Sequence, residues 1–463
     1  MIEQARGTLV PDEWRRAGSV VAIIGLGKSG VAAARLLARE GVRVYASDAS
    51  DHPYAGAAAE ALKGVPWVDV EIGRHDLTKI RHAAGVIVSP GVPPDAPVLT
   101  AARHAGVPIV SELDLGFRAL AALHPGTRSI AITGTNGKTT TTALVAHLLS
   151  AAGLQSTTAG NIGRPVTDLA MANERYQWLS LEVSSFQLHD SPNFAPEIGV
   201  LTNLAPDHLD RYPSAEAYYA DKRLLFRNAT ADDVWVLNAD DRLVLELARG
   251  VAGRKVLFSL AQSADAWYDA EQRVLHLGRD VLLARDQLHL LGDHNVANAL
   301  AAALAVQQAG VPAPLIGKGL QSFRALPHRL EPVREVGGVL WINDSKATNI
   351  AATTVAVLAM QRPFVLLLGG RHKGEPYTSL APLLADRCRL VIAYGEAGPR
   401  VEQDLGGKVE LERGSTFEDV VARASLAAQA GDTVLLSPAC SSYDMFKNYE
   451  ERGATFRRFV EAL

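Results

Sequence analysis

Apolar residues form two kinds of pattern along this chain. Short continuous runs, such as 20–24 and 129–133, are typical of strands that are buried on both faces of a sheet. Between such runs, apolar residues recur every three or four positions, as at Leu144 and Leu148, which is the spacing of a helix that packs on one side. Strands that alternate with helices predict mainly parallel sheets, so we expect an α/β fold.

This pattern breaks at two places and predicts three domains. A change in composition near 121–126 ends the first domain, and a polar segment near 326–329 begins the last. The length of 463 residues agrees with this division, because a domain averages about 150 residues. We therefore expect domains at 1–120, 121–326 and 327–463.

The clearest chemical motif follows the predicted strand at 129–133. A glycine-rich turn joins this strand to a predicted helix that starts with Lys138 and Thr139. Glycines let backbone N–H groups face a phosphate, the helix N-terminus adds positive charge, a lysine reaches the terminal phosphates and a threonine hydroxyl binds Mg²⁺. Ile132 stands where the general motif has a glycine, so this turn is shorter. We expect ATP and magnesium to bind here, and the alternative is an ordinary strand-to-helix turn. The predicted ATP-binding residues are Gly134, Thr135, Asn136, Gly137, Lys138, Thr139 and Thr140.

A second glycine-rich turn, GLGKSG at 25–30, lies between the strand at 20–24 and a predicted helix, and Asp48 follows in the next strand. This is the fingerprint of dinucleotide-binding folds, and alone it favours a nicotinamide or flavin enzyme. The glycines recognise only a pyrophosphate at a helix start, however, so a nucleotide-sugar diphosphate fits equally well. A Rossmann-like domain without a ligand is the remaining alternative.

Farther along the first domain, a strand at 85–88 runs into a proline-rich loop that contains Ser89 and Gly91. Doubly wound sheets place ligand contacts at the carboxyl ends of such strands. The loop is therefore a candidate ligand contact, with a plain turn as the alternative.

Three predicted strand ends in the central domain carry polar residues. Asn161 lies in a loop of small residues, and Glu182 ends an apolar run in which an unpaired carboxylate is costly to bury. A magnesium ion held by Thr139 is the natural partner of Glu182, and a structural ion pair is the alternative. The DHLD segment at 207–210 follows a third strand and predicts a metal site, a helix cap or a general base at His208.

Two helices of the central domain carry further candidate residues. Lys222 lies on a predicted helix and, from its spacing alone, is expected to be an ordinary solvated lysine. Asn295 and Asn298 lie three positions apart at the start of an alanine-rich helix. The two carboxamides either read a purine edge or cap the helix.

In the third domain, polar loops follow three of the four predicted strands. A parallel sheet gathers such loops at one edge. Two lysines, an arginine and several hydroxyls in the loops suit a small anionic substrate, and ordinary solvated loops are the alternative. The strands are predicted at 339–342, 364–368, 390–394 and 433–436, and the loops at 343–349, 369–374 and 437–443.

The overall composition excludes several classes of protein. Apolar residues make up 48% and charged residues 21%, as in an ordinary globular protein, and a formal charge of -4 argues against a nucleic-acid-binding surface. Cys388 and Cys440 are far apart, so a disulfide framework is not indicated. No run reaches the roughly 18 apolar residues that a membrane span needs, and 1–16 lacks the apolar core of a secretory signal and is expected to be a flexible extension. We therefore expect a cytoplasmic protein without membrane insertion.

Eight segments of the chain resemble motifs of the Mur ligase family, along essentially its whole length. They read TGTNGKTT, AGNIG, LEVSSFQL, TNLAPDHLDRYP, GDHNVANA, LPHRLE, NDSKATN and LLSPACSSYDMFKNYEERG. Within the family, the resemblance is greatest to the members that add D-glutamate to UDP-N-acetylmuramoyl-L-alanine. That choice rests mainly on NDSKATN and SPACSSYDMF, and on the lack of the DNPR-type signature of the relatives that add a diamino acid.

The resemblance implies a monomeric, cytoplasmic ligase of peptidoglycan precursor synthesis that uses ATP and forms an acyl phosphate. Its domains would be a Rossmann-like UDP-binding domain, a central P-loop-type ATPase domain with a mainly parallel sheet, and a Rossmann-like C-terminal domain that closes over the amino acid. Another Mur-type or folylpolyglutamate-type ligase shares this ATP machinery and is the first alternative. A dinucleotide oxidoreductase would leave the second phosphate-binding turn without a role, and a regulatory protein would bind ATP without turnover.

The resemblance also assigns roles to individual residues. Two magnesium ions are implied, one held by Thr139 and Glu182 and the other by His208 and Lys222, with Lys222 carbamylated. The implied catalytic residues are Lys138, Asn161, His208, Lys222 and Lys346. Contacts to adenosine are implied for Asn295, Asn298, Arg329 and Asp344. Contacts to the UDP substrate are implied for Gly25, Lys28, Ser29, Asp48, Ser89, Gly91, Asn161 and His208. Contacts to the amino acid are implied for His328, Lys346, Thr348, Lys373, Ser442, Tyr443 and Tyr449.

The chain departs from the family pattern at two sites. Ala49 and Ser50 follow Asp48 where the family carries a threonine and an arginine, and Tyr449 stands in place of a phenylalanine. The first departure bears on how the UDP group is held, and less on the reaction.

Overall fold

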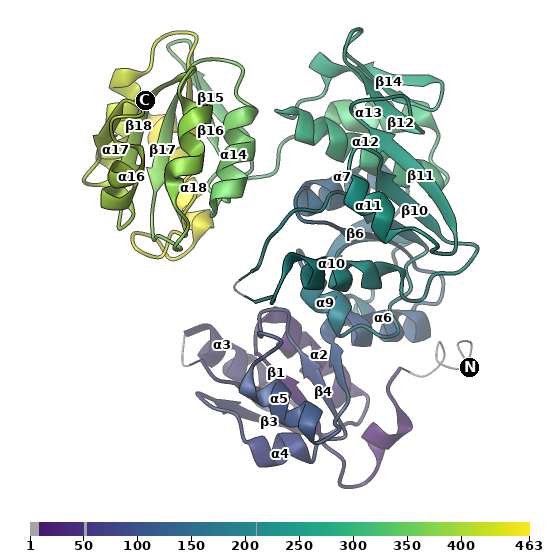
Figure 1. Ribbon diagram of the computed structural model, residues 1–463. Coiled ribbons are helices and arrows are strands. Elements are labelled where there is room, and N and C mark those ends of the chain that lie inside the picture. The colour runs from purple at the N-terminus through teal and green to yellow at the C-terminus, as the bar shows by residue number, and fades with distance from the viewer. Residues whose placement is uncertain (1–8, 51–52, 210) are drawn as a thin grey trace. The chain divides into compact units, whose positions relative to one another are not determined.

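The computed structural model describes residues 9–50, 53–209 and 211–463 (Figure 1). The chain forms two compact units. The first comprises Met1–Arg285 with Ala297–Gln321, and the second comprises Asp286–Val296 with Ser322–Leu463. Three sheets of five, nine and six strands are each mainly or wholly parallel, so the predicted α/β class is confirmed. The domain boundaries near 120 and 326 stay predictions.

The first sheet is parallel throughout, in the order β3-β2-β1-β4-β5. Its central strand is buried on both faces, because Val21 and Ile23 pack into one apolar cluster and Ala22 and Ile24 into another. This explains the continuous apolar run of β1. The strands are β1 (Val21–Ile24), β2 (Val44–Asp48), β3 (Val68–Ile72), β4 (Gly85–Val88) and β5 (Ile109–Ser111), with helices η1 (Asp12–Arg15), α2 (Lys28–Arg39), α3 (Pro53–Leu62), α4 (Leu77–Arg81), α5 (Pro97–His104) and α6 (Glu112–Leu123).

The second sheet has the order β14-β13-β12-β11-β10-β9-β6-β8-β7 and is parallel from β7 to β12. The predicted strand at 129–133 is β6, between β8 and β9. The antiparallel edge from β12 to β14 was not predicted, because its strands mix buried residues with half-buried or exposed ones and lack a continuous apolar run. The strands are β6 (Arg128–Thr133), β7 (Ser156–Gly160), β8 (Trp178–Glu182), β9 (Ile198–Leu201), β10 (Val234–Asn238), β11 (Arg254–Ser259), β12 (Ala266–Asp269), β13 (Val274–Leu277) and β14 (Asp280–Ala284). The helices of this part of the chain are α7 (Lys138–Ala151), α8 (Val166–Met171), α9 (Ser185–His189), α10 (Ala215–Arg223), η2 (Leu224–Phe226), α11 (Arg242–Leu247), η3 (Arg285–Gln287), α12 (Asp293–Gln308) and α13 (Ala313–Ser322).

The third sheet has the order β15-β16-β20-β17-β18-β19, and only β15 is antiparallel to its neighbour. All four strands predicted for this region are present, as β16, β17, β18 and β20. Both cysteines are free, as expected. The strands are β15 (Glu331–Val336), β16 (Val339–Asn343), β17 (Phe364–Gly369), β18 (Cys388–Tyr394), β19 (Leu411–Arg413) and β20 (Thr433–Leu436), with helices α14 (Ile350–Leu358), η4 (Tyr377–Leu380), α15 (Ala381–Leu384), α16 (Gly398–Leu405), α17 (Phe417–Ala427) and α18 (Tyr449–Ala462).

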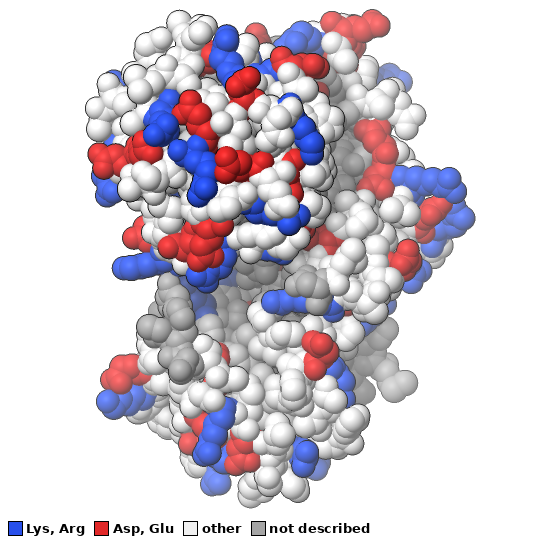
Figure 2. Space-filling view, turned by 60° about the vertical axis from the view of Figure 1, so that its left-hand side comes forward, with Lys and Arg blue, Asp and Glu red and all other residues white. Residues whose placement is uncertain are grey.

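Basic and acidic side chains are interspersed over the face shown in Figure 2. Across 9–50, 53–209 and 211–463, no helix has both the length and the apolar character to cross a membrane.

Candidate active site

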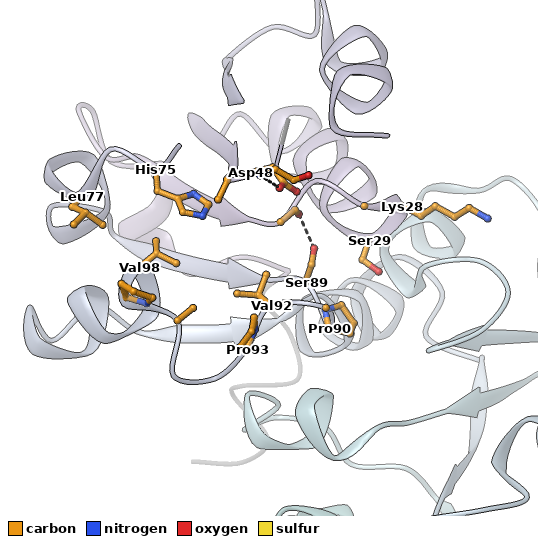
Figure 3. A pocket seen from close by; sticks show the side chains of 17 residues that line it. Lys28, Ser29, Asp48, His75, Leu77, Ser89, Pro90, Val92, Pro93 and Val98 are labelled. Atoms are coloured by element: carbon orange, nitrogen blue, oxygen red, sulfur yellow. Dashed lines mark hydrogen bonds between the residues drawn. The ribbon is translucent and has the colours of Figure 1, made fainter. Parts of the chain in front are cut away.

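The carboxyl ends of β1, β2 and β4 enclose a pocket of about 790 Å³ in the first compact unit (Figure 3). The pocket lies where the strand order reverses, which is the usual place for a ligand in a doubly wound sheet. Six residues predicted to bind the UDP substrate line it: Gly25, Lys28, Ser29, Asp48, Ser89 and Gly91. Asn161 and His208, which were also predicted for that substrate, lie instead at the second sheet.

Hydrogen bonds connect the glycine-rich turn to two neighbouring strand ends. The carboxylate of Asp48 accepts the backbone N–H of Leu26 at 2.7 Å and that of Ser50 at 2.9 Å. The hydroxyl of Ser89 donates to the carbonyl oxygen of Gly25 at 2.7 Å. Asp48 therefore stabilises the turn, and its direct contact with a ligand stays a prediction.

The second phosphate-binding motif has the predicted strand–turn–helix form, because β6 ends at Thr133 and α7 begins at Lys138. Gly134 has φ 141°, and a Cβ atom there would lie 2.0 Å from Oγ1 of Thr202. Gly137 has φ 82°, and a Cβ atom there would lie 2.2 Å from Oδ1 of Asn298. Both positions therefore require glycine.

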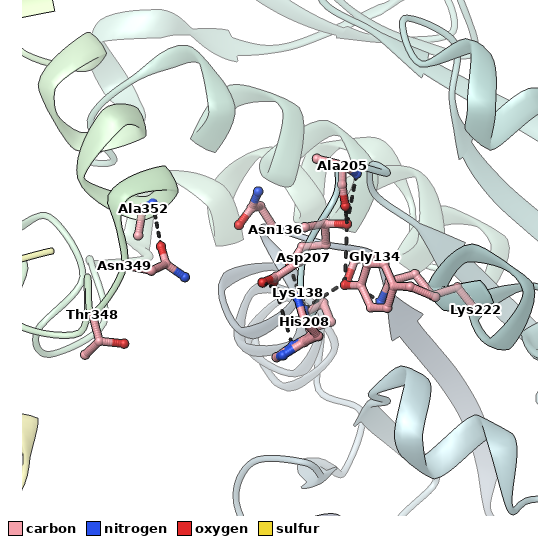
Figure 4. A network of polar contacts seen from close by, with 12 residues as sticks. Gly134, Asn136, Lys138, Ala205, Asp207, His208, Lys222, Thr348, Asn349 and Ala352 are labelled. Atoms are coloured by element: carbon pink, nitrogen blue, oxygen red, sulfur yellow. Dashed lines mark hydrogen bonds and ion pairs between the residues drawn. The ribbon is translucent and has the colours of Figure 1, made fainter. Parts of the chain in front are cut away.

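Two lysine side chains converge on this turn (Figure 4). Nζ of Lys138 donates to the carbonyl oxygens of Gly134 at 2.9 Å and Thr135 at 2.7 Å. Nζ of Lys222, from α10, donates to the same oxygen of Gly134 at 2.8 Å. The carbonyl oxygen of Gly134 thus accepts hydrogen bonds from both lysines.

Lys222 is buried, with only 1% of its surface exposed, so the expectation of a solvated lysine is wrong. Tyr218 precedes it by one helical turn and is equally buried, and Nζ of Lys222 lies 4.5 Å from the centroid of the tyrosine ring. Burial, and then the nearby charge of Lys138, lowers the pKa of Lys222 well below its usual range. A tyrosine four positions before the lysine was the local signal that this helix face is covered.

Glu182 ends β8 and is 2% exposed. Its Oε1 accepts a hydrogen bond from the amide of Asn161 at 2.8 Å, whereas its buried Oε2 has no hydrogen-bond partner within the described part of the chain. An unpaired buried carboxylate oxygen fits a cation. No three His, Cys, Asp or Glu side chains among the described residues are grouped to hold a metal, so Mg²⁺ at Glu182 would also need hydroxyl, phosphate or water oxygens, as it commonly does.

His208 follows β9 and has φ 55°. Its ring packs edge-on against Phe186, at a centroid distance of 5.2 Å, and against Tyr218, at 5.8 Å. Its Nε2 lies 3.7 Å from a carboxylate oxygen of Asp207. Figure 4 shows His208 and Asp207 beside Lys138, and the role of His208 at a metal stays a prediction. Asp210 of the same segment lies outside the described residues.

The two asparagines of α12 have separate environments. Oδ1 of Asn298 accepts the hydroxyl hydrogen of Thr141 at 3.3 Å, beside the phosphate-binding turn. The amide of Asn295 donates to the carbonyl oxygen of Leu291 at 2.8 Å. The contact of Asn295 is local and that of Asn298 joins α12 to α7, and recognition of a purine stays a prediction for both.

In the second compact unit, Asp344 is buried at the end of β16. Its carboxylate accepts the N–H of Leu330 at 3.1 Å and the hydroxyl of Ser437 at 2.8 Å. Burial raises the pKa of Asp344 to about 7, because it outweighs these hydrogen bonds and the nearby arginines. The two carboxylate oxygens of Asp344 therefore connect the end of β16 to the segments that carry Leu330 and Ser437. A contact to adenosine stays a prediction for Asp344 and for the nearby Arg329.

The segment from His328 to Leu330 has an unusual backbone. His328 has φ 64° and Leu330 has φ 41°, which side-chain-bearing residues rarely adopt. The ring of His328 lies 3.0 Å from the amide of Asn343 and packs against Tyr449 at a centroid distance of 6.0 Å. Its carbonyl oxygen accepts the N–H of Lys346 at 3.1 Å. The segments LPHRLE and NDSKATN and the start of α18 therefore meet at this residue.

The residues predicted for the amino acid gather at the strand ends of the third sheet, as expected from the adjacent positions of β16, β20 and β17. Nζ of Lys346 lies 5.4 Å from the ring centroid of Tyr449, and Nζ of Lys373 lies 3.5 Å from the hydroxyl of Thr348. Ser442 is buried and Tyr443 is 64% exposed.

Comparison with known proteins gives consistent matches along the chain. The segments 19–111, 132–306 and 328–440 match, in turn, the MurD-like Mur ligase N-terminal domain, the Mur ligase middle domain and the Mur ligase glutamate ligase domain. The UDP-N-acetylmuramoylalanine–D-glutamate ligase of Salinibacter ruber is 42% identical over 98% of this chain and 100% of its own, and that of Acidobacterium capsulatum is 41% identical over 96% of each chain. The chain belongs to the Mur ligase family.

Solved structures of Mur ligases and related enzymes agree with this fold. The UDP-N-acetylmuramate-alanine ligase MurC of Thermotoga maritima superposes with a TM-score of 0.60 at 19% identity, over 96% of this chain and 98% of its own. A pseudomurein peptide ligase type C from Methanothermus fervidus gives 0.59 at 19% identity, over 96% of this chain and 100% of its own. At this identity the likeness concerns the fold alone.

The C-terminal part of this Mur ligase contains a buried arginine that the sequence analysis missed. Arg452 of α18 is 0% exposed. Its guanidinium donates to the carbonyl oxygen and hydroxyl of Ser345, at 2.7 and 2.9 Å, and to the carbonyl oxygen of Cys440 at 3.1 Å. It therefore joins the loop after β16 to the loop after β20. An arginine in an amphipathic helix gives no sequence signal of such a role.

Proposed function

We propose that this Mur ligase adds D-glutamate to UDP-N-acetylmuramoyl-L-alanine with the use of ATP, through an acyl phosphate, in peptidoglycan precursor synthesis. The observation that carries the proposal is the full-length similarity to enzymes named for this reaction, at 41 to 42% identity. It is supported by two glycine-rich turns in one compact unit, one beside a pocket of about 790 Å³ and one with a lysine at the start of α7. A monomeric, cytoplasmic enzyme that uses no nucleic acid is part of the same proposal.

The reaction needs an activated carboxylate, because a free carboxylate is a poor electrophile. The acceptor carboxylate attacks the γ-phosphate of ATP, ADP leaves, and an acyl phosphate results. Lys138, at the positive end of α7, neutralises the charge that develops on the transferred phosphoryl group. The amine of D-glutamate then attacks the acyl carbon, a proton and phosphate leave, and the amide bond forms.

Magnesium fits the residues around the turn. Thr139 would offer its hydroxyl and Glu182 its unpaired Oε2 to a first ion, and His208 with Lys222 would hold a second. Bound magnesium supplies charge neutralisation between phosphate oxygens and the carboxylate. Asn161 orients Glu182 through the 2.8 Å hydrogen bond.

Carbamylation of Lys222 belongs to this proposal. The buried side chain favours the neutral amine, which is the form that attacks CO₂. The nitrogen bonds to the carbon of CO₂ and loses one proton, so the cation becomes a carboxylate-bearing ligand. In ¹³C-bicarbonate we expect a carbamate carbon signal in the native chain that is absent from Lys222→Met, and no signal in the native chain would contradict the modification.

The amino acid is assigned to the second compact unit. Lys346 and Lys373 suit the two carboxylates of D-glutamate, because ammonium groups form short charge-assisted hydrogen bonds with carboxylates. Thr348, Ser442, Tyr443, Tyr449 and His328 complete the proposed set.

The experiment that tests the function is phosphate release from ATP with UDP-N-acetylmuramoyl-L-alanine as acceptor. D-Glutamate, L-glutamate, L-alanine and L-lysine are offered in turn, and we expect turnover with D-glutamate alone. A chain that never converts ATP to ADP under these conditions, or one that prefers another amino acid, would overturn the proposal.

A further inference from the structure

The pocket of the first sheet contains a histidine that none of the sequence motifs accounts for. His75 lies in the loop between β3 and α4 and lines the same cavity as Lys28 and Asp48 (Figure 3). The side chain is half-buried, and its Nδ1 lies 2.9 Å from the hydroxyl oxygen of Ser47, which is fully buried on β2. The imidazole is therefore part of the pocket wall.

The loop that carries His75 is held at both ends. The N–H of Gly73 donates to the carbonyl oxygen of Asp48 at 2.8 Å, and the N–H of Asp76 donates to the hydroxyl of Tyr45 at 2.8 Å. The carboxylate of Asp76 also caps α4. With the backbone held and one ring nitrogen bonded to Ser47, the imidazole is fixed before a ligand arrives. A preorganised group loses little conformational entropy when it binds.

Burial lowers the pKa of His75, although the carboxylates of Asp48 and Glu71 oppose this shift. The ring is therefore neutral at neutral pH, with one nitrogen that donates and one that accepts.

The opposite wall of the pocket is apolar. Figure 3 shows Val92, Pro93 and Val98 across the cavity from His75 and Asp48. Leu77, next to His75, is 37% exposed in a position that a bound ring would cover. A slot with one apolar wall and one polar wall suits a flat heterocycle, whose faces are apolar and whose edge forms hydrogen bonds.

The two ends of the pocket suit two parts of one ligand. Lys28, in the first turn of α2, suits a diphosphate. We propose that His75, positioned by Ser47, hydrogen-bonds the edge of the uracil base of the acceptor and favours it over cytosine. This inference rests on the proposed function, in which the acceptor is a uridine diphosphate derivative. Uracil and cytosine exchange donors and acceptors at two neighbouring ring positions, so the His75 tautomer that pairs with uracil is the opposite of the one that cytosine requires, and the hydroxyl of Ser47 must reverse its hydrogen bond in the cytosine complex.

The test compares UDP and CDP binding to the full chain by titration calorimetry. His75→Phe keeps a planar ring and removes both nitrogens, so we expect UDP to bind about tenfold more weakly and its preference over CDP to narrow. His82→Phe is the matched control, because His82 is exposed on the same domain and its Nδ1 lies 2.8 Å from the backbone oxygen of Thr78. Ser47→Ala, which releases the ring, is expected to weaken UDP binding by a smaller factor. Melting temperatures show that each variant is folded.

Kinetics give a second readout. The KM for UDP-N-acetylmuramoyl-L-alanine should rise in His75→Phe with kcat unchanged, because the base is bound equally in the ground and transition states. The inference is overturned if the folded Phe and Ala variants both bind UDP as tightly as the native chain, or lose UDP and CDP affinity by the same factor. UDP selectivity that is lost in His75→Phe, in a native chain that adds no D-glutamate, would contradict the proposed function and would support the role of His75.

Discussion

At the scale of single residues, two lysines donate hydrogen bonds to the same carbonyl oxygen of Gly134 but differ in burial. Lys138 starts α7 and is half-buried, whereas Lys222 is enclosed by α10 and the turn at Gly134. Burial makes a charged amine costly and, with the nearby charge of Lys138, lowers the pKa of Lys222. The two lysines therefore have different proposed roles, although both contact Gly134.

We expect Lys138→Ala to reduce phosphate release by roughly 100-fold to 1000-fold, because a charge that stabilises the transferred phosphoryl group is lost. The assay measures phosphate with all three substrates at saturation. Lys63→Ala, which removes an exposed lysine paired with Glu60 on the first domain, serves as the control and should retain native activity. Near-native turnover in Lys138→Ala would show that another residue performs this role.

At the scale of elements, α6 and α8 connect the first two sheets at very close range. Glu112, the first residue of α6, accepts the N–H and the hydroxyl of Thr167 in α8, both at 2.7 Å. A Cβ atom at Gly116 of α6 would lie 2.6 Å from Cβ of Val166. The loop before α8 carries Asn161, so this helix pair helps to place the residue that orients Glu182.

Gly116→Ala should destabilise the protein by about 1–3 kcal/mol, since the added methyl group forces the two helices apart. Gly126→Ala is the matched control, because a Cβ atom there would meet nothing within 4 Å. Melting temperatures of the two variants measure the effect. An equal melting temperature for both would mean that α6 and α8 adjust without cost.

Glu112 also predicts a pH dependence of stability. Burial raises its pKa from 4.5 to about 7, so its carboxyl group contributes stability that is fully present below pH 4.5 and is lost as the pH rises through 7. The expected size is on the order of 3 kcal/mol. Glu112→Gln does not titrate, so its melting temperature relative to the native chain should rise between pH 5 and pH 8. Glu60→Gln, at an exposed position of α3, should show no such trend. The prediction is wrong if the difference in melting temperature between Glu112→Gln and the native chain stays the same from pH 5 to pH 8.

The elements of the fold were largely predictable, and the contacts between them were not. Continuous apolar runs identified β1, β6 and the four main strands of the third sheet, because a strand buried on both faces has a local signature. The contact of Lys222 with Gly134, the contact of Ser47 with His75 and the bonds of Arg452 to Ser345 join residues 28 to 107 positions apart, and no local pattern encodes these pairings. The glycine-rich turns were exceptions, because the spacing of their glycines between a strand and a helix predicts a phosphate-binding turn from local sequence alone.

At the scale of the whole molecule, each sheet presents polar residues at its carboxyl edge, and the two compact units carry different ones. The pocket of the first sheet and the glycine-rich turn before α7 belong to the first unit, and the loops around Lys346 and Lys373 belong to the second. Substitutions in the second unit should therefore act on one substrate at a time.

Lys373→Ala is expected to raise the KM for D-glutamate by roughly 10-fold to 100-fold, because one charge-assisted hydrogen bond is lost. The KM values for ATP and for the nucleotide acceptor should stay the same. Lys408→Ala is the control, since Nζ of Lys408 contacts only the backbone oxygen of Asp404 in α16. Parallel increases in all three KM values would indicate a general structural defect instead.

The buried guanidinium of Arg452 has a consequence for how amino-acid preference can change among relatives. It binds backbone oxygens and one hydroxyl, so the paths of two loops are set independently of the outward side chains they carry. Tyr443, on the loop after β20, can therefore be exchanged while the scaffold beneath it persists. Under the proposed function, selectivity for the amino acid can diverge by substitution at this position, without any rebuilding of the sheet.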